Sequence, residues 1–172
     1  MRRDDKGYQD FVFARYRHLV RCAVLLGCSP EDAEDATQEA LTRCYGAWSR
    51  VIAADDPDAY VYRVLVNGIS RSRRRRWRGE VPHAELPETP GGDPAPGVTL
   101  GVVVREALGR LGDNQRQVLV LRYFADLTES QIAAVLHVAP GTVKSRASRG
   151  LTALSQDAAL ADVLITPTEE DR

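Results

Sequence analysis

The chain has 172 residues, of which 44% are hydrophobic, and a formal net charge of −1 at pH 7. This length suffices for one medium core or two small ones. No stretch approaches the roughly 20 apolar residues that cross a bilayer, and the first residues lack the apolar run of a signal peptide, so we expect a cytoplasmic protein without a membrane span. The three cysteines form no CxxC pair, which favours reduced thiols over disulfides or a zinc site.

Charge is unevenly distributed along the chain. Residues 1–78 carry 15 Lys/Arg against 11 Asp/Glu, residues 79–99 carry four acidic and no basic residues, and residues 100–155 carry seven Lys/Arg against four Asp/Glu. Two basic segments thus flank an acidic connector, and this distribution indicates nucleic-acid contact by both. Excesses this small do not hold DNA tightly by themselves.

Helical periodicity dominates and strand-like alternation is nearly absent, so we predict an all-α fold. A first helix covers residues 8–26. Ser29 is the predicted N-cap of the second helix, with Pro30 in its first position, and this helix runs to about residue 48. A third helix begins near Pro57 and continues into the arginine run at 71–78.

Residues 79–99 contain five prolines and four glycines without apolar periodicity, and predict a flexible linker. Four shorter helices follow, over residues 103–111, 115–124, 129–136 and 141–154. We therefore expect two small helical domains, 1–78 and 100–155, joined by the flexible acidic linker 79–99. The acidic tail at 156–172 has no assignable role.

The second helix has an acidic face. Small apolar residues gather on one side, and the opposite side carries Glu31, Asp35, Gln38 and Glu39. This face is either a solvated surface or a docking site for a basic partner. Asp35 and Glu39 also have the i, i+4 spacing of a carboxylate metal site, but the helix has no histidine, so we expect neither a metal nor a cofactor.

Aromatic, amide and guanidinium groups share one narrow arc of the third helix. They are Tyr60, Arg63, Asn67, Arg71, Arg74 and Arg78. The side predicted to face a core carries Val61, Val64, Leu65 and Ile69. Groups on the arc can stack on bases, hydrogen-bond a displaced base and hold phosphates, as binding of a melted strand requires. A merely solvated arginine face is the alternative, and it explains Tyr60 and Asn67 less well.

Residues 127–154 predict a helix-turn-helix. Thr128 and Gln131 form a capping-box pair that opens the supporting helix, and residues 137–140 supply the turn. The second helix has an inward stripe of Val143, Ala147, Leu151 and Leu154. Its outward and flanking side chains are Thr142, Lys144, Ser145, Arg146, Ser148, Arg149 and Thr152. Small hydroxyls between cations suit a helix in the major groove, although an ordinary amphipathic hairpin is the alternative.

With these three segments in this order, the chain resembles the extracytoplasmic-function (ECF) sigma factors of the sigma-70 family, in particular their SigE-like actinobacterial subgroup. The resemblance covers roughly residues 8–155. Residues 32–48 are similar to region 2.2, which binds the clamp helices of the polymerase β′ subunit. Residues 58–77 resemble regions 2.3 and 2.4, which melt and read the −10 element. Residues 111–154 resemble region 4, which reads the −35 element.

The resemblance implies that the partners are core RNA polymerase, through its β′ clamp helices and β flap, promoter DNA and an anti-sigma protein. Its polymerase-binding positions match Asp32, Asp35, Gln38 and Glu39. It places Asn67 near the pocket for a flipped −10 base, so that the predicted −10 set is Tyr60, Arg63, Asn67, Arg71 and Arg74. The −35 positions match Lys144, Ser145, Arg146 and Arg149, to which the outward face of the hairpin adds Thr142.

Three positions depart from the family pattern. His137 and Ala139 stand where the family commonly has Gly and Ser. Ala139 cannot cap the second hairpin helix, whereas His137 tolerates a left-handed backbone. The family's tryptophan near residues 60–62 is absent, which leaves open the aromatic that contacts the melted strand.

Two other functions remain open. A dimeric, polymerase-independent regulator would use residues 1–78 for sensing and bind a palindromic site. A carboxylate-metal nuclease would use Asp32, Asp35 and Glu39, but no catalytic constellation is evident, so we do not expect an enzyme.

The favoured interpretation is a sigma factor. Because its domains have no fixed separation before polymerase binds, the free chain should bind promoter duplex weakly.

Overall fold

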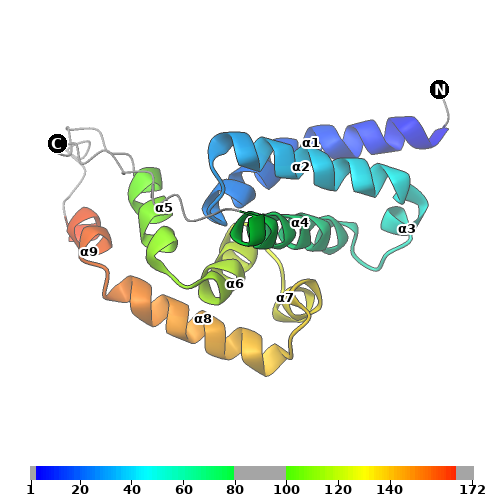
Figure 1. Cartoon of the computed structure of the whole chain (residues 1–172). Helices are drawn as coiled ribbons and strands as arrows, with labels where there is room; N and C mark the ends of the chain where they lie inside the picture. The colour runs from blue at the N-terminus through cyan, green and yellow to red at the C-terminus, as the bar shows by residue number, and fades with distance from the viewer. Residues whose placement is uncertain (1–2, 80–99, 166–172) are drawn as a thin grey trace, which may run out of the picture.

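The structure is a computed structural model that describes residues 3–79 and 100–165. Within these ranges the chain forms helices and no strand (Figure 1), which confirms the predicted all-α fold. The helices are α1 (Arg3–Leu25), α2 (Pro30–Gly46), α3 (Trp48–Ile52), α4 (Pro57–Gly79), α5 (Leu100–Arg110), α6 (Asp113–Tyr123), α7 (Glu129–Leu136), α8 (Pro140–Ser155) and α9 (Ala158–Ile165). Apart from Gly79, which ends α4, the predicted linker lies outside the described residues.

The helix starts follow from local chemistry. The hydroxyl of Ser29 accepts a hydrogen bond from the amide of Asp32 at 3.1 Å, as the predicted cap of α2 requires. The predicted capping box of Thr128 and Gln131 opens α7. Ala139 gives α8 no side-chain cap, and His137 has the left-handed φ of 54° that the turn needs.

The first module is a bundle of α1, α2 and α4, with the short α3 at one end (Figure 1). The predicted inward residues of α4 are buried, except for Val64, which is half-buried. Small residues make up most of the buried face of α2 and let α1 and α4 approach closely: this face consists of Ala33, Thr37, Ala40 and Cys44, together with the larger Leu41. The acidic side of α2 is thereby left to solvent.

The second module is built from α5 to α9. Helix α8 packs on α6 and α7 through Val143, Ala147 and Gly150. The predicted inward position of Leu151 is wrong, since 44% of this residue is exposed. A Cβ on Gly150 would lie 2.9 Å from Leu119 of α6, so α8 and α6 approach each other closely at this glycine. Because Gly150 faces α6, the next residue, Leu151, points outward.

The start of the predicted tail is structured. Arg110 at the end of α5 forms two hydrogen bonds with Asp157, at 2.7 and 2.8 Å, and α9 follows immediately and packs on α5. Asp157 also accepts from the amide of Leu160 at 3.3 Å and so caps α9. Residues 156–165 therefore belong to the second module.

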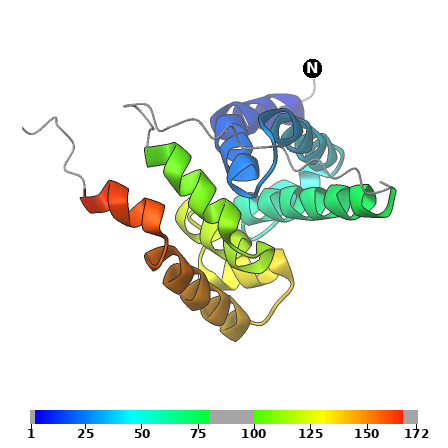
Figure 2. The same ribbon diagram turned by 60° about the vertical axis from the view of Figure 1, so that its left-hand side comes forward.

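The two modules pack against each other. Helix α4 lies beside α7, and α1 lies beside α5 and α6 (Figures 1 and 2). Buried side chains of both modules form one continuous apolar cluster. The expectation of two domains without fixed separation thus differs from this structure, because a tertiary contact, and not the linker, sets their arrangement. None of the described helices has the length and apolar character of a membrane span.

Candidate nucleic-acid interface

The acidic face of α2 is open to solvent. Asp35, Gln38 and Glu39 are exposed, and Asp32 is half-buried at the first turn. The carboxylate of Glu39 accepts a hydrogen bond from Arg43 one turn later, but the two side chains remain 50% and 41% exposed, so this pair contributes little stability. The structure therefore presents the four predicted polymerase-binding residues along one side of one helix.

A cleft separates this acidic face from α4. Its acidic wall contains Asp32, Asp35 and Glu39, and its opposite wall contains Ser72 and Arg73. Carboxylates and a guanidinium thus face the same cleft from two helices. Within the described residues, no group of three or more His, Cys, Asp or Glu is arranged to hold a metal ion.

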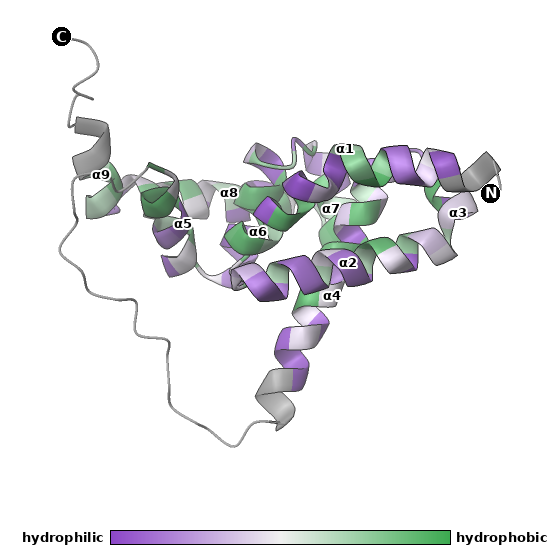
Figure 3. Cartoon of the chain, turned by 90° about the horizontal axis from the view of Figure 1, so that it is seen from above, coloured by the Kyte–Doolittle hydropathy of each residue, from purple (hydrophilic) through white to green (hydrophobic). Residues whose placement is uncertain are grey.

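The predicted −10 residues lie along α4, which runs out of the bundle with a largely hydrophilic surface (Figure 3). Tyr60 and Arg63 are half-buried, and the Arg63 guanidinium lies 4.8 Å from the centre of the Tyr60 ring. Asn67, Arg71 and Arg74 are exposed. The side chain of Arg78 lies outside the described residues. An aromatic ring, an amide and several guanidinium groups therefore share this surface.

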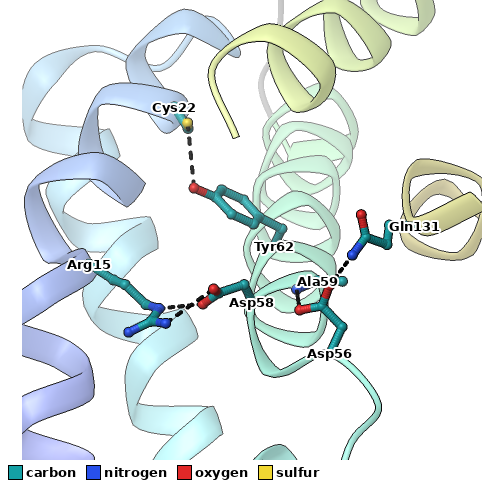
Figure 4. A network of polar contacts seen from close by, with 7 residues as sticks. All are labelled: Arg15, Cys22, Asp56, Asp58, Ala59, Tyr62 and Gln131. Atoms are coloured by element: carbon teal, nitrogen blue, oxygen red, sulfur yellow. Dashed lines mark hydrogen bonds and ion pairs between the residues drawn. The ribbon is translucent and has the colours of Figure 1, made fainter. Parts of the chain in front are cut away.

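Tyr62 does not belong to this surface. Only 5% of the residue is exposed, and its hydroxyl lies 3.9 Å from the thiol of Cys22 (Figure 4). Burial raises the pKa of the Tyr62 hydroxyl. With Tyr62 inside the core, Tyr60 is the aromatic of this pair that lies outside it, half-buried beside Arg63.

Polar contacts fix the beginning of α4 (Figure 4). Arg15 of α1 donates two hydrogen bonds to the carboxylate of Asp58, and this pairing raises the pKa of the guanidinium. Asp56 accepts from the amide of Ala59 at 3.0 Å and from the side-chain amide of Gln131 on α7. Tyr60 and Arg63 therefore project from a helix whose first turn is held on two sides.

The predicted −35 residues lie on the outer side of α8. Lys144 is exposed, and its ammonium lies 3.6 Å from the carboxylate of Glu129 on α7. Arg149 is exposed and donates to the carbonyl oxygen of Ser145 at 3.2 Å, one turn back. Thr142, Ser145 and Arg146 are half-buried at the edge of this face. Cations and hydroxyls thus share the outer side of α8.

Sequence reasoning missed two arginines with structural roles. Arg73 donates to the carbonyl oxygen of Leu26 and, at 3.1 Å, to the carboxylate of Asp113. Arg116 of α6 is 8% exposed and also donates to Asp113. Burial lowers the pKa of Arg116. Arg73 lies within the arginine run that the sequence analysis identified, whereas no local signal marks Arg116.

Comparison with known proteins agrees with this arrangement. Residues 8–79 match the family described as Sigma-70 region 2, and residues 102–154 match Sigma-70, region 4. The chain is 34% identical over 156 residues to an RNA polymerase sigma-E factor of Streptomyces coelicolor, covering 91% of this chain and 88% of the relative. It is 34% identical over 151 residues to the ECF RNA polymerase sigma factor SigM of Mycobacterium tuberculosis, covering 86% and 75%.

Solved structures share the fold. The sigma factor RpoE of Bartonella quintana, in complex with the anti-sigma factor NepR, has a TM-score of 0.73 at 22% identity, over 92% of this chain and 98% of that one. CnrH in complex with the cytosolic domain of CnrY has a TM-score of 0.62 at 21% identity, over 92% and 90%. Two family matches in the order of the two modules, and relatives that span nearly the whole chain, establish that the protein belongs to the sigma-70 family as an RNA polymerase sigma factor of the ECF type.

Proposed function

We propose that this sigma factor docks on core RNA polymerase through the acidic face of α2, defined by Asp32, Asp35, Gln38 and Glu39. The observation that carries the proposal is the solvent exposure of Asp35, Gln38 and Glu39 opposite a buried face of small residues. Docking there leaves the core of the bundle undisturbed. The partner surface should be basic, as in the β′ clamp helices that the family resemblance implies.

The two other surfaces divide promoter recognition between them. The exposed part of α4 contacts the melted −10 strand, with Tyr60 stacking, Asn67 hydrogen-bonding a base, and Arg63, Arg71 and Arg74 holding phosphates. Helix α8 enters the major groove of the −35 element with Lys144 and Arg149 at its surface. Thr142, Ser145 and Arg146 line the edge of that contact. The second module would also meet the β flap of the polymerase.

This role is one of binding and needs neither a catalytic group nor a cofactor. It places the protein in the cytoplasm, where RNA polymerase works. An anti-sigma protein is a further proposed partner, supported by the compact fold that the chain shares with a sigma factor solved in complex with NepR.

Charge reversal on α2 tests the docking assignment. Asp35→Arg with Glu39→Arg should abolish retention of core polymerase in a pull-down, because the substituted face repels a basic partner. Both sites are exposed, so we expect the change in stability at each to stay within about 0.5 kcal/mol. The matched control reverses two exposed carboxylates elsewhere, Asp10→Arg with Asp55→Arg, at the same net charge. Retention of polymerase by the α2 variant at the control's affinity would refute the docking face.

A further inference from the structure

Hydroxyl groups on the outer side of α8 donate back to the helix. Ser145 donates to the carbonyl oxygen of Thr142 at 3.1 Å, and Thr152 donates to that of Ser148 at 3.0 Å. A hydroxyl group has a single proton, so each of these oxygens can only accept a further hydrogen bond. The hydroxyl of Ser145 is therefore an acceptor on the side of α8 that is proposed to meet the DNA.

Arg149 uses one edge of its guanidinium group to bind Ser145. Its Nε lies 3.2 Å from the carbonyl oxygen of Ser145, and its Nη2 lies 3.4 Å from the hydroxyl oxygen. A planar guanidinium can make a bidentate contact side-on, through Nε and Nη2, or end-on, through Nη1 and Nη2. The two oxygens of Ser145 occupy the side-on edge, and these bonds leave the end-on edge unused.

The contact also sets where the guanidinium lies along α8. Ser145 precedes Arg149 by four residues, so the side chain of Arg149 is drawn one turn toward the start of the helix. Base edges are contacted by the N-terminal part of a recognition helix. Arg149 is exposed, and an exposed arginine loses rotamer entropy when DNA fixes it. A guanidinium that is already held near its binding position loses less.

We propose that Ser145 is a positioning residue for recognition of the −35 element, because it holds the side-on edge of Arg149 and so presents the end-on edge to the O6 and N7 acceptors of a guanine. Ser145 then sets the base specificity of Arg149 without itself contacting the base. This inference deepens the proposed function and rests on the contact of α8 with the −35 element.

Three substitutions on α8 separate this role from a general effect on the helix. Ser145→Ala removes the acceptor for Nη2 of Arg149, whereas Ser145→Thr retains a hydroxyl. Ser155→Ala is the matched control. The hydroxyl of Ser155 donates to the carbonyl oxygen of Thr152 at 2.8 Å, three residues back, as Ser145 does to Thr142. Ser155 is exposed at the end of α8, so its loss repeats the chemical change away from Arg149.

The experiment uses holoenzymes assembled from core polymerase and each variant. The probes are a promoter fragment identified by run-off transcription and the same fragment with its −35 segment scrambled. The measured quantity is the ratio of the two affinities, which a fraction of misfolded protein does not change because it lowers both equally. Ser145→Ala should reduce this ratio roughly two- to tenfold, as expected for loss of one hydrogen bond.

Ser145→Thr and Ser155→Ala should both keep the ratio of the unmodified protein. An unchanged ratio in Ser145→Ala would overturn the proposal. The same holds for a ratio in Ser145→Thr or Ser155→Ala that is as low as in Ser145→Ala, because the effect would then not depend on the hydroxyl beside Arg149.

A double-mutant cycle with Arg149→Ala distinguishes positioning from direct contact. Once Arg149 is removed, Ser145→Ala should not reduce the ratio further, since a positioning residue acts through Arg149. A further loss as large as in the single variant would show that Ser145 contacts the DNA itself, and would overturn the proposal. An unchanged ratio in Arg149→Ala would refute the proposed base contact of Arg149 together with this inference. A reduced ratio in Arg149→Ala beside an unchanged one in Ser145→Ala would refute the inference alone.

Discussion

Arg149 and Lys144 lie on the same helix in different surroundings. Arg149 is held along α8 by hydrogen bonds to Ser145, at 3.2 Å to the carbonyl and 3.4 Å to the hydroxyl. Lys144 pairs loosely with Glu129 across the turn. A planar guanidinium suits bidentate contact with a guanine edge, whereas an ammonium acts as a point charge.

Arg149→Ala should therefore cost about 1 to 3 kcal/mol at one base pair of the −35 element. Lys144→Ala should weaken binding about equally on all sequences. Affinities of holoenzymes carrying each variant for consensus and scrambled −35 elements distinguish the two roles. Equal losses on both elements for Arg149→Ala would show that Arg149 contacts phosphate only.

Two buried thiols should make the folded protein less stable at alkaline pH. Burial raises the pKa of Cys22 and of Cys44 from 9.0 to about 11. The folded state thus keeps its thiol protons at pH values where the unfolded chain has lost them. This contribution is fully present below about pH 9 and disappears as the pH rises through about 11.

The urea concentration at the midpoint of unfolding should accordingly decrease as the pH is raised from 9 to 11. Cys44→Ala should reduce this slope, because one of the two thiols no longer titrates, although the variant is less stable at neutral pH. An unchanged slope in Cys44→Ala would contradict the assigned cause. Cys28, which is half-buried, is left in place in both proteins.

At the scale of residues, the exposure of several proposed site positions was predictable, and one question was left open although the sequence contained its answer. The exposed positions Asn67, Arg71 and Arg74 follow from helical periodicity alone. The sequence analysis placed Tyr60 in the predicted −10 set but left open which aromatic residue contacts the melted strand. The spacing of Tyr62, Leu65, Val66 and Ile69 is i, i+3, i+4, i+7, so the sequence did contain the signal that Tyr62 is buried.

At the scale of elements, Gly150 determines how α8 sits on α6. The buried positions of α8 are Val143, Ala147 and Gly150, with Leu154 half-buried. Hydrophobic periodicity assigned Leu151, and not Gly150, to the inward stripe of α8, because large apolar residues define such a stripe and glycine has no side chain. The close approach to Leu119 is a tertiary constraint that the sequence of α8 does not contain.

Gly150→Ala should lower the thermal unfolding midpoint. The added methyl would meet Leu119, which is itself 2% exposed, and overpacking costs about 1 to 3 kcal/mol. Gly141→Ala is the matched control on the same helix, since a Cβ there meets nothing within 4 Å. It should leave stability unchanged or raise it by up to about 1 kcal/mol. Equal shifts for both variants would contradict the proposed packing.

Helix α9 was not predicted from the sequence. Its anchor is the pair Arg110–Asp157, which joins positions 47 residues apart. The sequence analysis assigned no role to the acidic tail, yet Asp157 both caps α9 and pairs with α5. Local caps such as Ser29 and Thr128 were predictable because donor and acceptor lie within three residues.

At the scale of the whole molecule, the packing of the modules was the largest feature that the sequence did not reveal. Burial of Arg116 depends on the backbone at Gly27, and the contact of Gln131 with Asp56 spans 75 residues. Neither is visible in periodicity or composition. Weak binding of promoter duplex by the free chain remains a prediction.

The central claim is that this chain directs core RNA polymerase to specific promoters. The most direct measurement is run-off transcription on genomic fragments with purified core polymerase, with and without the protein. We predict discrete transcripts that appear only when the protein is added, and that disappear with the Asp35→Arg, Glu39→Arg variant. The same transcripts without the protein, or nanomolar binding of a palindromic duplex by a dimer of the chain alone, would contradict it.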